Sequence, residues 1–369
     1  MSLINLNNEQ KLIQNEVRKF AAAELEPMAS EIDNSAVFPI EIIKKLSDLG
    51  LSSVIIPEKY GGAALDTTSL CIVLEELSKA SASIGTILVV NNCLVAFPLI
   101  HYAPEEKKGY YLQRLSQGEI GAFSADPEID VPDRKFECRE MDGNYMISGK
   151  QDFVLNGETA NFFIMQVSLS NGKGLYIFDN NKGIKCTKHD ILGMRAAGIT
   201  GLEFKDITLM SDTCILSGNR AEEGFQRLRD YANIGFSAVS LGIAEAAYDA
   251  SIKYSKERRQ FGRAICEFPM VQEMLVAMKS RFEAARFFTY EAAVQCDRGQ
   301  DYSLNASIAR LQSSEAAVFS GIKAIQVHGG YGYIKDYPVE RYLRDAKVLQ
   351  VLRQTPHDLK SEIAKGLLA

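Results

Sequence analysis

Apolar residues recur at spacings of three and four over the first third of the chain, the period of an amphipathic helix. Residues 69–81 and 105–119 show this pattern, and the turn-forming stretch PEKYGG at 57–62 precedes both. From about residue 119 to 216 the pattern changes to short apolar stretches divided by DG, NGK and NNKG, which are strand and turn signals. The sequence therefore predicts a helical region followed by a small β region.

Helical periodicity resumes from about Ala221 in two long apolar stripes. One stripe contains Val271, Met274 or Leu275, Met278, Phe282, Ala285 and Phe288, and the other contains Leu304, Ile308, Leu311, Val318, Ile322 and Ile325. Long striped helices predict a helical bundle. We expect an α+β protein with a helical domain over 1–118, a β domain over 119–217 and a helical bundle over 218–369.

Composition narrows the function classes. A net charge of −6 argues against nucleic acid as the main ligand. The seven cysteines form no C-x-x-C pair, which predicts reduced thiols, and the four histidines are too dispersed for a zinc site, so we expect no metal.

The N-terminal segment predicts a helix rather than a signal peptide. The most apolar run, 84–100, is interrupted by Asn91 and Asn92 and falls short of the ~18–20 residues that span a bilayer. We expect a cytoplasmic protein without a membrane partner.

Three motifs carry the strongest signal: FPIEIIKKLSDLGLSSVIIPEKYGG (38–62), ERRQFGRAI (257–265) and AIQVHGGYGYIKDYPVERYLRDAK (324–347). At these separations they resemble the acyl-CoA dehydrogenase flavoprotein family, and the resemblance runs nearly end to end. It implies an N-terminal helical domain, a middle β-barrel and a C-terminal four-helix bundle. It also implies FAD at a subunit interface, in a homodimer or homotetramer.

The second and third motifs supply chemistry suited to a dinucleotide. Arg258 offers a rigid fork of donors for a pyrophosphate, and Phe261 offers an aromatic face. Gly329 and Gly330 let the backbone approach a ligand closely. The resemblance implies that Arg258 and Phe261 hold the FAD of a neighbouring subunit, and it adds Gln326 and Gly330 as FAD contacts. A solvated basic helix end is the alternative for ERRQFG.

The β region departs from the family pattern in AFSADPEID. Ala125 stands where the family has an alcohol, and EIDVP replaces a glycine-serine segment, although Asp126 and Pro127 fit. In GKQDFVLNG, Phe153 takes the aromatic position that packs on the isoalloxazine, whereas Leu155 replaces a threonine that commonly bonds the ring. Phe153 by itself is more typical of strand core, and only its neighbours give it meaning as a flavin contact. The implied FAD contacts in these two segments are Ala122, the backbone N–H groups of Ser124 and Ala125, Phe153 and Leu155.

Two segments bear on the substrate carrier. In the family, the glycine-serine segment helps to line the entry for the pantetheine and nucleotide of CoA, so its loss favours a thioester on an acyl carrier protein. The segment LGMRAAGITGLEF (192–204) is similar to a branch acting on carrier-bound polyketide extender units. An ordinary strand after a glycine-rich turn is the alternative for that segment.

The family's catalytic base is absent from both of its usual positions. A buried glutamate normally removes a proton next to the thioester carbonyl. In VLRQT, Arg353 occupies the glutamate position, Gln354 occupies the glycine position and Thr355 occupies the threonine position. Thr355 is therefore kept as an FAD contact implied by the resemblance. At the earlier helical position used by some branches, Ala232 replaces the acid and Asn233 replaces an arginine.

Other acids have little motif support. Glu315 fits structural scaffolding, and Asp230, beside Tyr231, lies outside any motif. Arg353 cannot act as a base at neutral pH, but it can hold a carboxylate through two parallel hydrogen bonds. The alternative is a shifted turn in which Arg353 faces solvent.

The resulting interpretation is an FAD-dependent oxidoreductase acting on a carrier-protein thioester. A sharper hypothesis is oxidation of an aldehyde hydrate to the carboxylate of an amino- or hydroxymalonyl extender unit for polyketide or nonribosomal peptide biosynthesis, with Arg353 holding that carboxylate. Three alternatives stay open: conventional acyl-CoA dehydrogenation with an unlocated base, a flavin-dependent oxygenase on the same fold, and a non-catalytic flavin-binding relative.

Overall fold

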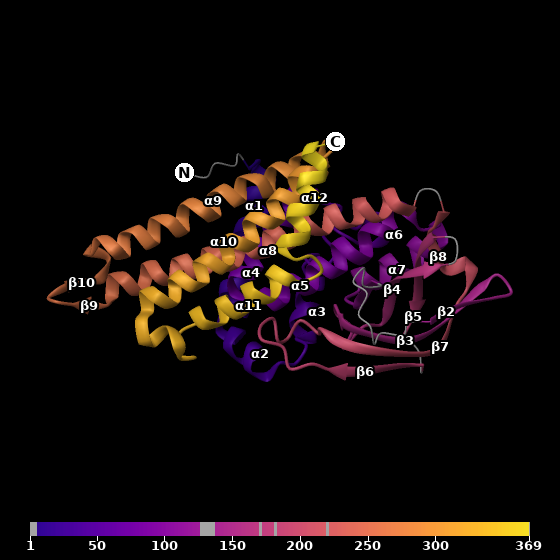
Figure 1. Cartoon of the computed structure of the whole chain (residues 1–369), viewed down its shortest axis with the longest axis horizontal. Coiled ribbons are helices and arrows are strands. Elements are labelled where there is room, and N and C mark those ends of the chain that lie inside the picture. Colours follow the sequence, from indigo (N-terminus) through magenta and orange to yellow (C-terminus); the bar gives the residue numbers. More distant parts are fainter. Residues whose placement is uncertain (1–5, 126–136, 170–171, 181–182, 219–220, 369) are drawn as a thin grey trace.

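The computed structural model describes residues 6–125, 137–169, 172–180, 183–218 and 221–368. Helices precede and follow a β region, so the predicted α, β, α order is confirmed (Figure 1). The first helices are α1 (Asn8–Phe20), α2 (Ala29–Ser35), α3 (Ile40–Asp48), α4 (Thr67–Ala80), α5 (Ala82–Val89), α6 (Phe97–Tyr102) and α7 (Glu105–Ser116). The π-helical segment η4 (Val90–Ala96) joins α5 to α6.

The helical stretch over 82–102 runs through the core. It has 21 residues and is the one described helix long and apolar enough to span a bilayer, but 94% of its apolar window is buried inside the protein. The expectation that this stretch is too short was therefore wrong, because the helix continues through both asparagines. Asn92 Nδ2 donates to the carbonyls of Leu88 and Ser52, each at 3.0 Å, and Asn91 Oδ1 accepts the N–H of Gly121 at 3.3 Å. The asparagines thus fix this core helix to its neighbours.

The strands form two four-stranded sheets in the described residues. One has the order β1 (Gly121–Ala125), β4 (Phe162–Leu169), β5 (Gly172–Asp179), β8 (Cys214–Leu216), and the other β2 (Glu137–Met141), β3 (Asn144–Val154), β7 (Thr200–Leu209), β6 (Ile184–Lys188). Strand β1 is parallel to β4, and the other pairings are antiparallel. The sheets meet where the N–H of Phe123 donates to the carbonyl of Leu155 at 3.3 Å.

Strand β4 is buried on both faces. Phe163 and Met165 belong to the apolar cluster between the two sheets, whereas Phe162 and Ile164 belong to the larger core shared with the helices. This division follows from the two-residue period of a strand. The same alternation turns Phe123 of β1 toward the helical core and Ala122 toward the inter-sheet cluster.

The C-terminal helices are α8 (Ala221–Glu257), α9 (Pro269–Asp297), α10 (Ser303–His328), α11 (Val339–Val351) and α12 (Pro356–Leu368), and the short hairpin of β9 (Arg259–Gln260) and β10 (Arg263–Ala264) follows α8. Helix α10 packs against α8, α9 and α11. Its buried face is mostly Ala, Ser and Gly; a Cβ on Gly321 would lie 2.9 Å from the Cα of Leu343. Ile322, expected in the buried stripe, is 48% exposed, because the small residues form the closely packed face instead.

Candidate active site

Four of the predicted FAD residues line one cavity of about 480 Å³ at the end of α8 and α10: Arg258, Gln326, Gly329 and Gly330. Tyr254, His328 and Tyr331 form aromatic walls around them. The ring of Tyr254 stacks on that of His328, with centroids 4.2 Å apart, and the guanidinium carbon of Arg258 lies 5.6 Å from the centroid of Tyr331. The cavity thus combines flat apolar surfaces with a cation, the chemistry that a nucleotide and its phosphates require.

Local structure explains how these groups meet. Helix α10 ends at Gly329, whose φ of 59° lies in the left-handed region that glycine tolerates without cost. The two glycines then leave the backbone open to the cavity. Arg258 follows the last residue of α8, and its carbonyl accepts the N–H of Ile265 at 2.9 Å, which folds the hairpin back on the helix end. The open backbone at Gly329 and Gly330 is consistent with the prediction that a ligand can approach the backbone closely here.

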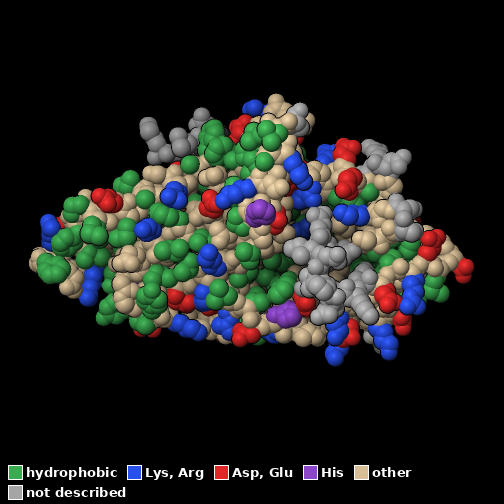
Figure 2. Space-filling model, in the orientation of Figure 1, with side chains coloured by type: hydrophobic (Ala, Val, Ile, Leu, Met, Phe, Trp, Pro, Cys, Tyr) green, Lys and Arg blue, Asp and Glu red, His purple; other side chains and the backbone are tan. Residues whose placement is uncertain are grey.

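Phe261 lies at the tip of the hairpin, outside the cavity. Its side chain is 91% exposed, and its backbone is left-handed with a φ of 51°. Met270 and Tyr333 are also highly exposed, and apolar side chains gather at this end of the molecule (Figure 2). Exposed apolar surface of this kind is typical of a protein contact.

Five of the other predicted FAD residues lie on or directly beside strands β1 and β3 of the two sheets (Figure 1). Ala122, Ser124 and Leu155 are buried, and the Ser124 hydroxyl has no hydrogen-bond partner among the described residues. Phe153 is 56% exposed, has a φ of 61°, and its ring lies 5.1 Å from that of His189. Phe153 is therefore presented at the surface of its sheet rather than buried in strand core. Asp126 and Pro127 lie outside the described residues.

The turn that joins α11 to α12, residues 352–355, reaches the sheet that contains β1; we call it the Arg353 turn. The guanidinium carbon of Arg353 lies 4.5 Å from the ring centroid of Phe123, a cation–π contact with β1. Arg353 has a φ of 67°, and its side chain is exposed. Thr355 caps α12: its N–H and hydroxyl both donate to Asp358, at 2.8 and 2.7 Å. Arg353 thus faces solvent and also lies against the strand that carries predicted flavin contacts.

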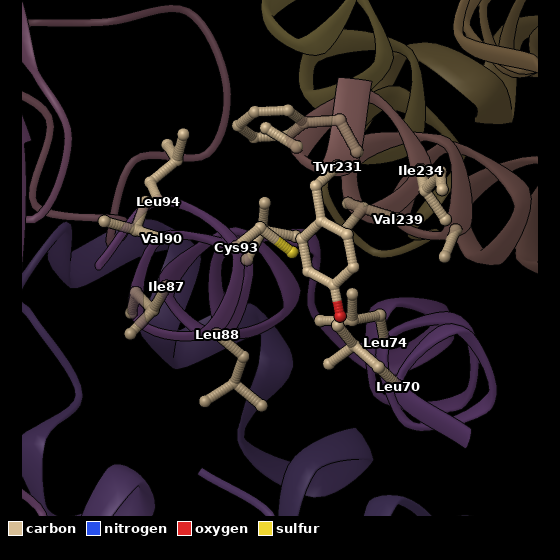
Figure 3. Packing of buried hydrophobic residues seen from close by; sticks show 14 of the residues in the cluster. Leu70, Leu74, Ile87, Leu88, Val90, Cys93, Leu94, Tyr231, Ile234 and Val239 are labelled. Carbon is tan, nitrogen blue, oxygen red and sulfur yellow. The ribbon is translucent and has the colours of Figure 1, made fainter. Parts of the chain in front are cut away.

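The second base position, on α8, holds no acid. Ala232 is buried, and Asn233 is 4% exposed with an Nδ2 that has no described partner. Tyr231 is core: its ring stacks on Phe97 at 4.2 Å, and Figure 3 shows its hydroxyl pointing toward Leu70 and Leu74 of α4. Tyr231 is thus a packing residue in this structure.

Two further acids from the sequence have structural partners. Glu315 pairs with Lys360 at 3.4 Å, which agrees with a scaffolding role. Burial raises the pKa of Asp230 to about 6. Its Oδ2 accepts from the Ser303 hydroxyl at 2.7 Å, and its Oδ1 accepts from Gln226 Nε2 at 2.8 Å. Both oxygens of Asp230 are therefore engaged.

The LGMR segment makes structural contacts with α11. The N–H of Met194 donates to Asp345 Oδ1 at 2.6 Å, and Arg344 Nη1 donates to the carbonyl of Leu192 at 3.0 Å. A Cβ on Gly193 would lie 2.3 Å from the carbonyl carbon of Arg344, so only glycine permits this approach. These contacts support the alternative reading of LGMR as a structural turn before a strand.

Comparison with known proteins identifies the family. A model of the acyl-CoA dehydrogenase N-terminal domain matches residues 7–119, and one of the acyl-CoA dehydrogenase C-terminal domain matches residues 224–367. The chain belongs to the acyl-CoA dehydrogenase family. It is 35% identical, over 99% of its length, to the short-chain specific acyl-CoA dehydrogenase of Clostridium acetobutylicum, of which it covers 98%.

Two solved structures of the family are informative. Butyryl-CoA dehydrogenase from Megasphaera elsdenii matches 99% of this chain and 100% of its own with a TM-score of 0.93 and 29% identity. A prolyl acyl carrier protein oxidase matches 98% of this chain and 100% of its own with a TM-score of 0.92 and 27% identity.

This acyl-CoA dehydrogenase family member is an FAD-dependent oxidoreductase, so the predictions of fold, enzyme class and cofactor are confirmed. The residues present fit the cofactor, because the Arg258 cavity offers a cation, open backbone and aromatic walls. The roles of the individual site residues stay predictions. Sequence reasoning missed Arg310, a buried arginine behind the Arg353 turn, because its partners lie far away in the chain.

Proposed function

We propose that this enzyme oxidises a thioester carried by an acyl carrier protein, and that Arg353 binds a carboxylate of the substrate or product. The position of Arg353 carries the proposal. An arginine lies beside β1 where the family places its base, and neither base position contains a carboxylate. A guanidinium binds carboxylates well and cannot remove a proton at neutral pH.

The chemistry best suited to this arrangement is oxidation of an aldehyde hydrate to a carboxylic acid. The C–H bond of the hydrated carbon breaks and its hydrogen leaves as a hydride, while one hydroxyl group loses its proton to water and its C–O bond becomes C=O. FAD, when bound, would supply the hydride acceptor. Because that carbon already bears oxygen, no strong carbon-acid base is required. Arg353 then holds the carboxylate of a substituted malonyl thioester as it forms.

The effect of Arg353→Ala tests this role. The variant is expected to lose about 10- to 100-fold in kcat/KM on a carrier-bound aldehyde substrate, the range of a charge-assisted pair. Lys347→Ala, which removes an exposed positive charge from α11, serves as the control. Unchanged kinetics in Arg353→Ala would remove the proposed role.

The carrier protein is supported by the altered EIDVP segment and by the likeness to a prolyl acyl carrier protein oxidase. We expect the same acyl group to be turned over faster on a carrier protein than on free CoA. We also expect the enzyme to act in the cytoplasm. Equal efficiency with the CoA thioester would contradict this preference.

We also propose that each FAD site combines two chains of a homo-oligomer. The predicted FAD residues divide between the Arg258 cavity and the sheets, which lie far from the cavity in the same chain (Figure 1). Phe261, beside the cavity, is exposed. Co-expression of Arg258→Glu with Phe153→Asp tests the arrangement. Random dimers should recover about a quarter of the wild-type FAD content if the site is shared, because half of the dimers keep one intact site. No recovery would place both groups in one chain's site.

Conventional acyl-CoA dehydrogenation is a second candidate, favoured by Asp230, a buried carboxyl with a pKa raised to about 6. If Asp230 is the base, Asp230→Asn abolishes flavin bleaching by butyryl-CoA. If the wild-type flavin is not bleached, this candidate fails.

A further inference from the structure

Arg310 is a fully buried arginine in the first third of α10, only 1% exposed. In the described part of the chain no carboxylate pairs with it. Its Nη2 donates to the carbonyls of Leu349 and Leu352, its Nη1 lies 3.5 Å from Ser240 Oγ, and its guanidinium carbon lies 5.2 Å from the ring centroid of Phe236. Burial lowers the pKa of Arg310, yet a guanidinium stays protonated at neutral pH. The protein therefore keeps a costly buried cation whose main partners are backbone carbonyls.

The two carbonyls explain why the cation is placed there. Helix α11 ends at Val351, and the last carbonyls of a helix lack partners within it. They also lie at the negative end of the helix dipole. Nη2 of Arg310 donates to the carbonyl of Leu349 in the last turn and, at 3.5 Å, to that of Leu352 just beyond it, so that one nitrogen contacts both sides of the helix end.

Leu352 directly precedes Arg353, whose left-handed backbone is unfavourable for a residue with a Cβ. Such a conformation persists where its surroundings determine it strongly. The N–H of Gln354 donates to the Leu352 carbonyl at 2.9 Å, and its Nε2 donates to Glu362 at 2.8 Å. The cap between Thr355 and Asp358 fixes the other side of the turn.

We propose that Arg310 is a positioning residue: it fixes the end of α11 so that the guanidinium of Arg353 is held over Phe123, where it binds the substrate carboxylate. The binding part rests on the proposed function, whereas the positioning part does not. Arg310 acts through Arg353 and does not itself contact substrate.

Limited trypsin digestion of the FAD-loaded protein tests the positioning. Trypsin cleaves after Arg353 only when the turn opens locally. Arg310→Met is expected to speed cleavage of the Arg353–Gln354 bond about 10-fold relative to other sites. Arg310→Lys keeps the positive charge but loses the planar guanidinium that places Nη2 and packs against Phe236, so it should give an intermediate rate. Arg286→Met is the control, because Arg286 is a largely buried arginine of the same bundle that bonds Glu75 and Glu245 instead.

The outcome is decisive in either direction. Selective cleavage at Arg353 in the Arg310 variants, absent from Arg286→Met, supports positioning. Equal acceleration at all sites shows a general structural role and overturns it. If Arg310→Met does not fold, the comparison of Arg310→Lys with Arg286→Met gives the same decision.

Binding of malonyl-pantetheine and its methyl ester, followed by the flavin absorbance, tests the second part. Wild type should prefer the free carboxylate by about 10- to 100-fold. Arg353→Ala and Arg310→Met should each lose that preference while binding the ester normally, and the double variant should lose no more. A preference kept in Arg310→Met overturns the inference. No preference in wild type overturns the proposed function instead, and the trypsin result still decides the positioning.

Discussion

The Arg258 cavity lies at the ends of α8 and α10, whereas the Arg353 turn lies against β1, and the two regions differ in how closely their residues follow the family pattern. The cavity contains four of the five FAD residues predicted from its two motifs, namely the arginine, the glutamine and both glycines, whereas Phe261 lies outside it. In the proposed function the turn carries a cation, Arg353, at the position predicted for the family's base, and the predicted FAD contacts on the adjoining strands include Ala125 and Leu155 in place of alcohols. Cofactor binding and bond chemistry can therefore change separately in one fold.

The difference also concerns how each region is built. The Arg258 cavity comes from the ends of α8 and α10, and two short sequence motifs supply it. The Arg353 turn depends on Arg310 of α10, Glu362 of α12 and Phe123 of β1. A region assembled from distant segments can acquire new chemistry through one substitution while its supports persist.

The largest expected effect comes from returning a carboxylate to the turn. If the chemical difference is confined to Arg353, then Arg353→Glu should raise the rate of anaerobic flavin bleaching by butyryl-CoA about 10²- to 10⁴-fold, the contribution of a positioned general base. Loss of flavin absorbance measures the rate, and Arg353→Gln controls for removal of the cation. Equal rates in both variants would show that the difference extends beyond the turn.

A smaller effect is expected at the other end. Arg258→Ala should weaken FAD binding about 10- to 100-fold, the range of a charge-assisted bond to phosphate, whereas Arg353 variants should retain FAD. The flavin-to-protein ratio after gel filtration measures this loss. The adjacent Arg259→Ala is the matched control, because Arg259 does not line the cavity. Similar losses in both arginine variants would indicate general surface charge rather than a pyrophosphate contact.

These two regions also show which features sequence reasoning can find. Arg258, Gly329 and Gly330 were found because local motifs carry their chemistry, and the cavity brings them together. The segregation of helices and strands followed from hydrophobic periodicity, which reports only the local chain. The buried face of α10 was predicted wrongly at Ile322, since small residues permit closer helix packing and leave the larger side chain outside.

The residues that hold the Arg353 turn in place, by contrast, form no sequence motif. Arg310 lies on the small-residue face of α10, so its burial could have been suspected from the spacing of Ala306, Ser313 and Ala317. Its partners, however, are backbone carbonyls some 40 residues later, and backbone acceptors leave no trace in the side-chain sequence. The left-handed φ of Arg353 was equally hidden, because the residue is neither glycine nor asparagine.

The smallest expected effect concerns Asp345 of α11, the helix that leads to the turn. Burial raises the pKa of Asp345 to about 6, above the ordinary value near 3.9. The folded protein therefore favours the protonated acid, so stability is lost as the pH rises from about 4 through 6. Asp345→Asn stays neutral and can still accept the Met194 N–H, so it should be about 1–3 kcal/mol more stable than wild type at pH 7.5 and equal to it near pH 4.

Urea unfolding between pH 4 and 8 measures this difference, and Asp358→Asn is the control of opposite sign. Hydrogen bonds from Thr355 lower the pKa of Asp358, so its contribution is present throughout this pH range and is lost only below it, as the pH falls through the lowered pKa. Asp358→Asn should therefore be less stable than wild type at every pH in the series. FAD content and the carboxylate preference should be unchanged in Asp345→Asn, because neither the Arg258 cavity nor the Arg353 turn loses a contact. Destabilisation at pH 7.5 would mean that attraction to Arg341 and Arg344 outweighs burial, and that α11 is held by charge rather than by the Met194 hydrogen bond.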